Sequence, residues 1–146
     1  MTAGKRLHLH PTTLANREGE ASMACVLVID DEEVVRLVLR QILERAGHQI
    51  HEATNGYEAL SVFGQVEPDL VITDIIMPKM EGFQTIAELM RRNSAVKIIA
   101  MSGGGRTNDR DCLEFAKIVG ADTTLAKPFR PQELLEAVHN TLGRSD

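Results

Sequence analysis

Chemically distinctive side chains follow apolar runs at several places in this 146-residue chain. In chain order they are Asp30 with Asp31, Asp74, Ser102 and Lys127. If each run is a strand of a parallel sheet, these side chains meet in one crevice, because open α/β sheets bind ligands outside the carboxyl ends of their strands. The spacing therefore predicts a single site at one edge of a sheet.

Three carboxylates in one crevice repel each other and raise their own pKa values unless a cation neutralises them. Oxygen ligands of this kind, with room for water and a phosphate, suit Mg²⁺. The Ser102 hydroxyl, the Lys127 ammonium and the amides of Gly103 and Gly104 are donors for phosphoryl oxygens. Each residue alone has an ordinary explanation, such as capping a helix or a turn. Together they favour an acyl-phosphate site in which a carboxylate is the nucleophile.

Short apolar runs and helical spacings alternate along the chain and define the elements that must position these residues. The runs predict strands at 25–29, 49–53, 70–74, 96–101 and 123–126. The intervening patterns predict helices at 34–46, 57–65, 82–92 and 108–119, and a last helix that begins at Pro131. Five strands alternating with five helices predict an α/β fold, a doubly wound parallel sheet in three layers.

Composition narrows the class of protein. The net charge of −5, without a basic stripe, argues against direct nucleic-acid binding. No apolar run approaches the ~20 residues of a membrane span. Cys25 and Cys112 lack metal-type spacing, so we expect reduced core thiols in a cytoplasmic protein.

The elements fill one domain at residues 23–143. Residues 1–22 show neither a helical period nor a signal-peptide pattern and are expected to be a poorly ordered N-terminal extension. Residues 144–146 form a short C-terminal tail. No internal repeat or linker is visible, so one domain is expected to carry the function.

The motif set resembles the receiver domain of two-component response regulators over residues 23–143. The set comprises Asp30 and Asp31, the run 74–78 with Gly82, Ser102, and the tripeptide 127–129. The resemblance implies a flavodoxin-like sheet with strand order 2-1-3-4-5. It also implies a signalling switch that catalyses its own phosphorylation and dephosphorylation, in place of a turnover enzyme.

The same resemblance implies roles for individual residues. Asp74 would accept a phosphoryl group from the phosphohistidine of a sensor histidine kinase or a histidine phosphotransfer protein. Mg²⁺, or Mn²⁺ in its place, would be held by Asp31, Asp74 and the backbone carbonyl of Ile76, with Asp30 acting through water.

The phosphoryl group itself would contact Lys127, Ser102 and the amide of Gly103. The Lys127–Pro128 bond is usually cis in the family, and Gly82 is expected to meet a backbone requirement at the start of the third helix. The downstream partner is not implied, and the chain is expected to be a monomer or a weak homodimer.

Two features depart from the family pattern. Thr124 stands where receivers usually carry a switch aromatic, and three consecutive glycines follow Ser102. The glycines enlarge the backbone freedom of the segment before the fourth helix. We therefore expect phosphorylation to act on that segment directly, with Arg106 available on its outside, and to change the surface around the fourth helix and fifth strand.

Other readings stay open at the level of the sequence. A Mg²⁺-dependent phosphohydrolase of the haloacid-dehalogenase type would need a second carboxylate where Ile76 stands, and a cap domain. A degenerate receiver acting as an adaptor, and a receiver module from a hybrid kinase or multidomain regulator, are the remaining candidates. A phosphate-binding loop is disfavoured because the glycine run lacks the Gly-Lys-Ser/Thr signature.

Overall fold

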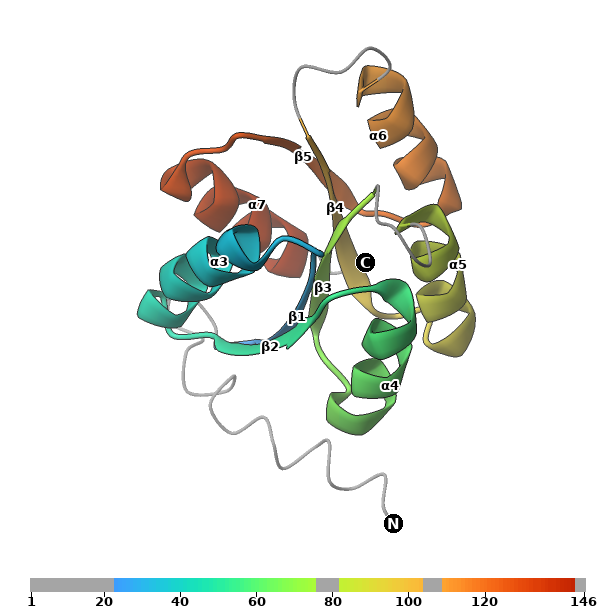
Figure 1. Cartoon of the computed structure of the whole chain (residues 1–146), viewed down its shortest axis with the longest axis horizontal. Coiled ribbons are helices and arrows are strands. Elements are labelled where there is room, and N and C mark those ends of the chain that lie inside the picture. Colours follow the sequence, from blue (N-terminus) through green and yellow to red (C-terminus); the bar gives the residue numbers. More distant parts are fainter. Residues whose placement is uncertain (1–22, 76–81, 104–108, 144–146) are drawn as a thin grey trace.

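The computed structural model describes residues 23–75, 82–103 and 109–143, and this part of the chain forms a five-stranded parallel sheet with five helices (Figure 1). The strands are β1 (Cys25–Ile29), β2 (Gln49–Ala53), β3 (Leu70–Asp74), β4 (Lys97–Gly103) and β5 (Thr123–Lys127), and the helices are α3 (Glu33–Arg45), α4 (Gly56–Val66), α5 (Gly82–Arg92), α6 (Asp109–Val119) and α7 (Pro131–Gly143). The strand order is β2-β1-β3-β4-β5. The predicted α/β fold and strand order are confirmed.

Both faces of the sheet are covered, as a parallel sheet requires. Helices α4, α5 and α6 lie on one face, and α3 and α7 lie on the other (Figure 1). Strand β1 is apolar because its side chains are buried on both faces of the sheet. Leu27 and Ile29 pack into the core on the side of α4, α5 and α6, while Val26 and Val28 pack into the core on the side of α3 and α7. Because all five strands run parallel, their carboxyl ends lie at the same edge of the sheet.

Strands β4 and β5 extend further than their apolar runs predicted. Ser102 and Gly103 belong to β4, and Lys127 belongs to β5. The register pairs Gly103 with Lys127 beyond the last apolar residues. The predicted ends were wrong by one or two residues because backbone pairing continues after the side chains stop being apolar.

The N-terminus of α4 carries a capping arrangement that the sequence analysis did not identify. The Asn55 side chain accepts a hydrogen bond from the Glu58 amide, and the Glu58 carboxylate accepts from the Thr54 amide. Asn-x-x-Glu is a variant of the capping box, so the signal was present in the sequence. It places the first helical residue at Gly56, one residue before the predicted start.

Several predictions lie outside the described residues or at their margin. They include the N-terminal extension, the C-terminal tail, and the side chains of Cys112 and Arg106. Cys25 is half-buried, with its Sγ 4.0 Å from the Val66 carbonyl oxygen, so it lies at the margin of the core. None of the described helices combines the length and the apolar character needed to span a membrane.

Candidate functional site

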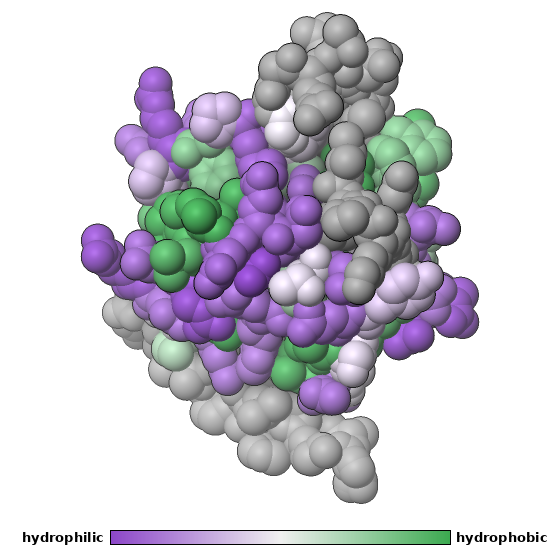
Figure 2. All heavy atoms as spheres, viewed as in Figure 1, coloured by the Kyte–Doolittle hydropathy of each residue, from purple (hydrophilic) through white to green (hydrophobic). Residues whose placement is uncertain are grey.

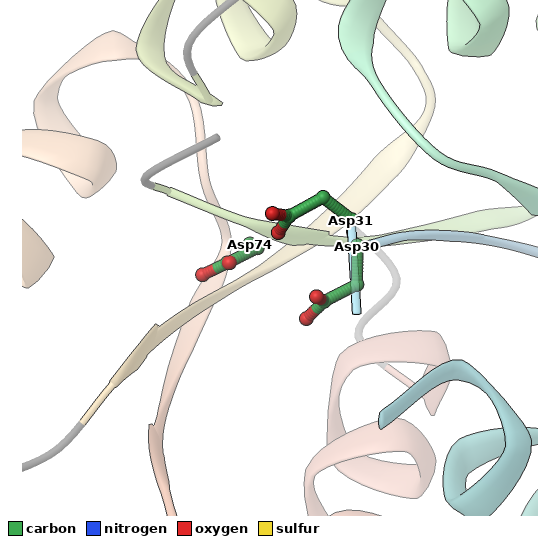
Figure 3. A group of neighbouring side chains, drawn as sticks. All are labelled: Asp30, Asp31 and Asp74. Atoms are coloured by element: carbon green, nitrogen blue, oxygen red, sulfur yellow. The ribbon is translucent and has the colours of Figure 1, made fainter. Parts of the chain in front are cut away.

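Three carboxylates meet at the carboxyl edge of the sheet. Asp30 and Asp31 come directly after β1, and Asp74 is the last residue of the adjacent strand β3. One carboxylate oxygen from each lies within 4.8 Å of the others. Figure 3 shows the three side chains close together at this edge. Asp30 and Asp74 are buried, whereas Asp31 is exposed.

Lys127 brings a positive charge to these carboxylates from the end of β5. Its Nζ lies 3.2 Å from Asp30 Oδ2 and 3.7 Å from Asp74 Oδ2. We call Asp30, Asp31, Asp74 and Lys127 the acidic cluster. Its four side chains carry three carboxylates and one ammonium, so the cluster is short of positive charge when all of them are ionised.

The titration behaviour of the cluster follows from burial and this charge balance. Burial, followed by the charge of Asp30, raises the pKa of Asp74 to about 6. Burial also raises the pKa of Asp30, although the Glu32 amide and Lys127 oppose the shift. Burial alone would lower the pKa of Lys127, but the charges of Asp74 and Asp30 outweigh it and the pKa of Lys127 is raised. Burial and the neighbouring negative charge therefore disfavour the ionised form of Asp74.

Asp30 already has partners for both of its carboxylate oxygens. Oδ1 accepts from the Glu32 amide at 2.9 Å, and Oδ2 accepts from Lys127 Nζ at 3.2 Å. The first bond closes a turn between β1 and α3, as aspartates in such turns commonly do. Both oxygens of the buried Asp30 side chain therefore bond to the protein, whereas the Asp31 side chain is exposed to solvent.

Gly82 packs directly behind Asp74. Its amide donates to the Ile75 carbonyl at 2.7 Å, and the Ile75 amide donates to the Met101 carbonyl at 2.9 Å. A Cβ at position 82 would overlap with the Asp74 carbonyl oxygen and the Ile75 backbone. The predicted backbone requirement at Gly82 is therefore a close approach between α5 and the end of β3.

A cavity of about 600 Å³ opens beside the carboxylates. Asp31, Asp74, Gly103 and Lys127 line its polar end. Its apolar wall is formed by side chains of α3 and of the segment after β5: Val34, Val35, Val38, Pro128 and Phe129. Figure 2 shows apolar side chains gathered over α3 beside a largely hydrophilic surface. The cavity can admit a polar group that is carried on a partly apolar partner.

The remaining predicted site residues are placed as follows. Gly103 lines the cavity, whereas Ser102 is buried in β4 and is absent from the described lining. Ile76 and Gly104 lie outside the described residues. The Lys127–Pro128 bond is cis. Thr124 is half-buried in β5, opposite Ala100.

The donor set fits a hard divalent cation. Carboxylate oxygens are the ligands that Mg²⁺ prefers, and it commonly binds through one or two carboxylates with several waters. Asp31 and Asp74 both reach the cavity, which leaves room for water and a phosphoryl group. The excess negative charge of the acidic cluster would attract such a cation.

Arg36 and Glu52 are neighbours of the site that sequence analysis missed. Arg36 Nη1 donates to the Asp30 carbonyl oxygen at 2.8 Å, and Arg36 Nε donates to Glu52 Oε1 at 2.8 Å. The signals available were a basic residue near the start of the predicted helix and an acidic residue within a predicted strand. Neither signal alone identifies a contact.

Known proteins with similar sequences share this arrangement of strands and helices. A family model described as a response regulator receiver domain matches residues 26–139. The chain is 37% identical over 115 residues to the chemotaxis protein CheY of Thermotoga maritima, covering 78% of this chain and 93% of that protein. It is 40% identical over 122 residues to the probable transcriptional regulator ycf27 of Pyropia yezoensis, covering 83% of this chain and 48% of that protein.

The chain thus spans about half the length of that regulator. Among solved structures, a response regulator receiver domain protein from Clostridium thermocellum superposes with a TM-score of 0.77 at 32% identity, covering 84% of this chain and 96% of that one. Phosphorylation and Mg²⁺ binding are typical of these modules. From the family match, the sequence relatives and the shared fold, this chain belongs to the response regulator receiver domains of two-component signalling systems.

Proposed function

We propose that this chain is a phosphoacceptor receiver, in which Asp74 takes a phosphoryl group from a phosphohistidine of a sensor histidine kinase or a histidine phosphotransfer protein. The observation that carries the proposal is the position of Asp74. Its carboxylate lies at the polar end of an open cavity, within 4.8 Å of the Asp30 and Asp31 carboxylates and 3.7 Å from Lys127 Nζ.

In the proposed step, an Asp74 carboxylate oxygen attacks phosphorus and the phosphorus–nitrogen bond breaks. The electron pair stays on the departing imidazole nitrogen. Lys127 holds an oxygen of the phosphoryl group, and the Gly103 amide and Ser102 hydroxyl donate to the others. Ser102 would first have to move from its buried position in β4.

Asp31 and Asp74 are the side chains proposed to hold Mg²⁺, with Asp30 acting through water and the Ile76 carbonyl completing the set. When bound, Mg²⁺ supplies positive charge that offsets the carboxylates and the transferred phosphoryl oxygens. Mn²⁺ has the same ligand preference and would serve in its place. Asp30 keeps Lys127 in reach of Asp74 through the bond at 3.2 Å.

The proposed output is a change in the surface formed by α6 and β5, which a downstream protein would read. Phe115 and Ile118 are exposed on α6, and the Phe115 ring packs edge-on against Phe83 of α5, with the ring centroids 4.8 Å apart. Thr124 lacks the ring that would couple Ser102 to this surface. The proposed coupling therefore runs through the glycine-rich segment that leads into α6, in a cytoplasmic protein acting as a monomer or weak dimer.

Intact-mass spectrometry after incubation with acetyl phosphate tests the proposed function. We expect the wild-type chain to gain one phosphoryl group in the presence of Mg²⁺ and none when EDTA is present. The variant Asp74→Asn keeps the size of the side chain and should gain none under either condition. Equal phosphorylation of the wild type and Asp74→Asn would refute Asp74 as the acceptor.

A further inference from the structure

Arg36 joins three elements next to the acidic cluster. As the fourth residue of α3, it donates to the carbonyl oxygen of Asp30, just after β1, and to the Glu52 carboxylate of β2, both at 2.8 Å. Its side chain is only 12% exposed. A guanidinium donates in fixed directions, so two simultaneous bonds define the position of the carbonyl relative to β2.

The turn before α3 is held by contacts other than a side-chain cap from the N-cap residue. The N-cap residue, Glu32, makes no side-chain capping bond. The peptide group between Asp30 and Asp31 is instead held through its carbonyl by Arg36, while the Asp30 amide donates to the Ala53 carbonyl at 3.1 Å. That peptide group leads directly into Asp31, so its orientation sets the direction in which the Asp31 side chain leaves the backbone.

Glu52 keeps Arg36 in place. One oxygen of Glu52 accepts from Arg36, and the other accepts from Arg40 Nε at 2.5 Å. Burial alone would raise the pKa of Glu52, but the bonds from Arg40 and Arg36 outweigh it, and the pKa is lowered. Glu52 therefore stays ionised at neutral pH. Arg40 shares this carboxylate, yet its other bonds run to Glu44 and to the Ile50 carbonyl.

We propose that Arg36, held by Glu52, is a positioning residue that fixes the peptide group between Asp30 and Asp31 and so directs the Asp31 carboxylate into the divalent-cation site. The inference rests on the proposed function, because it assigns Arg36 a role in preparing the site proposed there. Arg36 touches neither the cation nor the phosphoryl group in this proposal. It acts through the backbone that carries a ligand.

Calorimetric titration of Mg²⁺ into the full chain tests the inference. We expect Arg36→Met, which keeps an apolar stem but removes every donor, to weaken Mg²⁺ binding about tenfold, the size typical of residues that orient a metal ligand. Arg40→Met is the matched control. It removes an arginine from the same Glu52 carboxylate without touching Asp30, and its Mg²⁺ affinity should stay within about twofold of wild type.

A double-variant comparison separates positioning from general destabilisation. Glu52→Ala should weaken Mg²⁺ binding through the loss of support for Arg36, and adding it to Arg36→Met should cause little further loss. In the metal-free chain, the Glu32 amide, which donates to Asp30 Oδ1, should exchange its hydrogen faster in Arg36→Met than in Arg40→Met. If Arg36→Met does not fold, Arg36→Lys replaces it. Lysine keeps the charge but cannot donate to both acceptors in the same geometry. Because Asp31 would then be less well oriented, we expect Mg²⁺ to bind at least about threefold more weakly.

Each outcome of these titrations decides the inference. Wild-type Mg²⁺ affinity in the Arg36 variant, or equal losses in Arg36→Met and Arg40→Met, would overturn the positioning role and leave the proposed function intact. Absence of Mg²⁺ binding by the wild type, or unchanged binding by Asp31→Asn, would overturn the metal site itself and the inference with it. A selective loss in the Arg36 variant supports both.

Discussion

Two charged clusters contact Asp30, and their charge balances differ. The acidic cluster has three carboxylates and one ammonium. The second, which we call the arginine cluster, consists of Arg36, Arg40, Glu44 and Glu52 and has two charges of each sign. The pKa of Glu52 is lowered by its partners, whereas the pKa of Asp74 is raised to about 6 by burial and by Asp30.

The difference in charge balance distinguishes the arginine cluster, which is a structural network, from the acidic cluster, which is suited to bind a ligand. In the arginine cluster Glu52 is bonded to two guanidinium groups that lower its pKa, so its ionised form favours the folded state. In the acidic cluster the ionised form of Asp74 opposes folding until a cation or a proton arrives. The same residue types therefore stabilise one region and leave the other short of positive charge.

Removing Lys127 should produce the largest effect on stability. Lys127→Met leaves the buried Asp30 carboxylate without its cation, and we expect a loss of about 3 kcal/mol in the free energy of unfolding at pH 7. Urea denaturation in EDTA measures it. The loss should shrink at pH 4, where Asp30 can protonate. A loss that is the same at both values of pH would contradict the role of Lys127 as the partner of a charged Asp30.

Matched amide substitutions in the two clusters should have opposite signs. Asp74→Asn removes a charge that is unfavourable in the folded state, and we expect it to stabilise the metal-free chain at pH 7 by up to about 3 kcal/mol. Glu52→Gln removes a favourable charge and should destabilise by about 1 kcal/mol. The same denaturation measurement compares them, and shifts of equal sign would break the contrast.

The pH dependence of stability should carry the same signature. Folded Asp74 keeps its proton up to about pH 6, whereas an unfolded aspartate loses it near pH 4. Between these values the folded state binds more protons, so this residue makes the free energy of unfolding fall as pH rises, by at most about 1.4 kcal/mol per pH unit. Subtracting the profile of Asp74→Asn from that of the wild type isolates the contribution. A difference that is flat from pH 4 to pH 6 would show that the pKa is not raised.

The smallest effect is expected at the outer edge of the arginine cluster. Glu44 pairs with Arg40 one helical turn away, and both side chains are substantially exposed. Glu44→Gln should change the free energy of unfolding by no more than about 0.5 kcal/mol. A loss above 1 kcal/mol would mean that the arginine cluster acts as one cooperative unit.

The body of the fold and the position of Asp74 could be predicted from the sequence because both follow from local patterns. Apolar runs define the strands, and the change from Ile72 to Asp74 marks the edge of the sheet. The strand order came from the family resemblance and not from the residues. The extra length of β4 could not be read locally, because it depends on backbone pairing between Gly103 and Lys127.

The support around the site was harder to predict for a different reason. Arg36 reaches Asp30 and Glu52 because α3 packs against both β1 and β2. The sequence separation of 16 residues between Arg36 and Glu52 carries no periodic signal. Likewise, the bond between Lys127 and Asp30 joins residues 97 positions apart, and the alternation of strands and helices predicts only that both lie at the same edge of the sheet.

Thermal unfolding as a function of Mg²⁺ concentration tests the contrast between the clusters most directly. We predict that the wild type and Glu44→Gln, a variant of the arginine cluster, gain stability together and saturably, by roughly 2.7 kcal/mol at a hundredfold excess over Kd, while Asp31→Asn gains almost none. The contradicting result would be an unfolding midpoint that does not change with Mg²⁺ in the wild type, or that rises equally in Asp31→Asn. Either result would show that the acidic cluster is not a cation site.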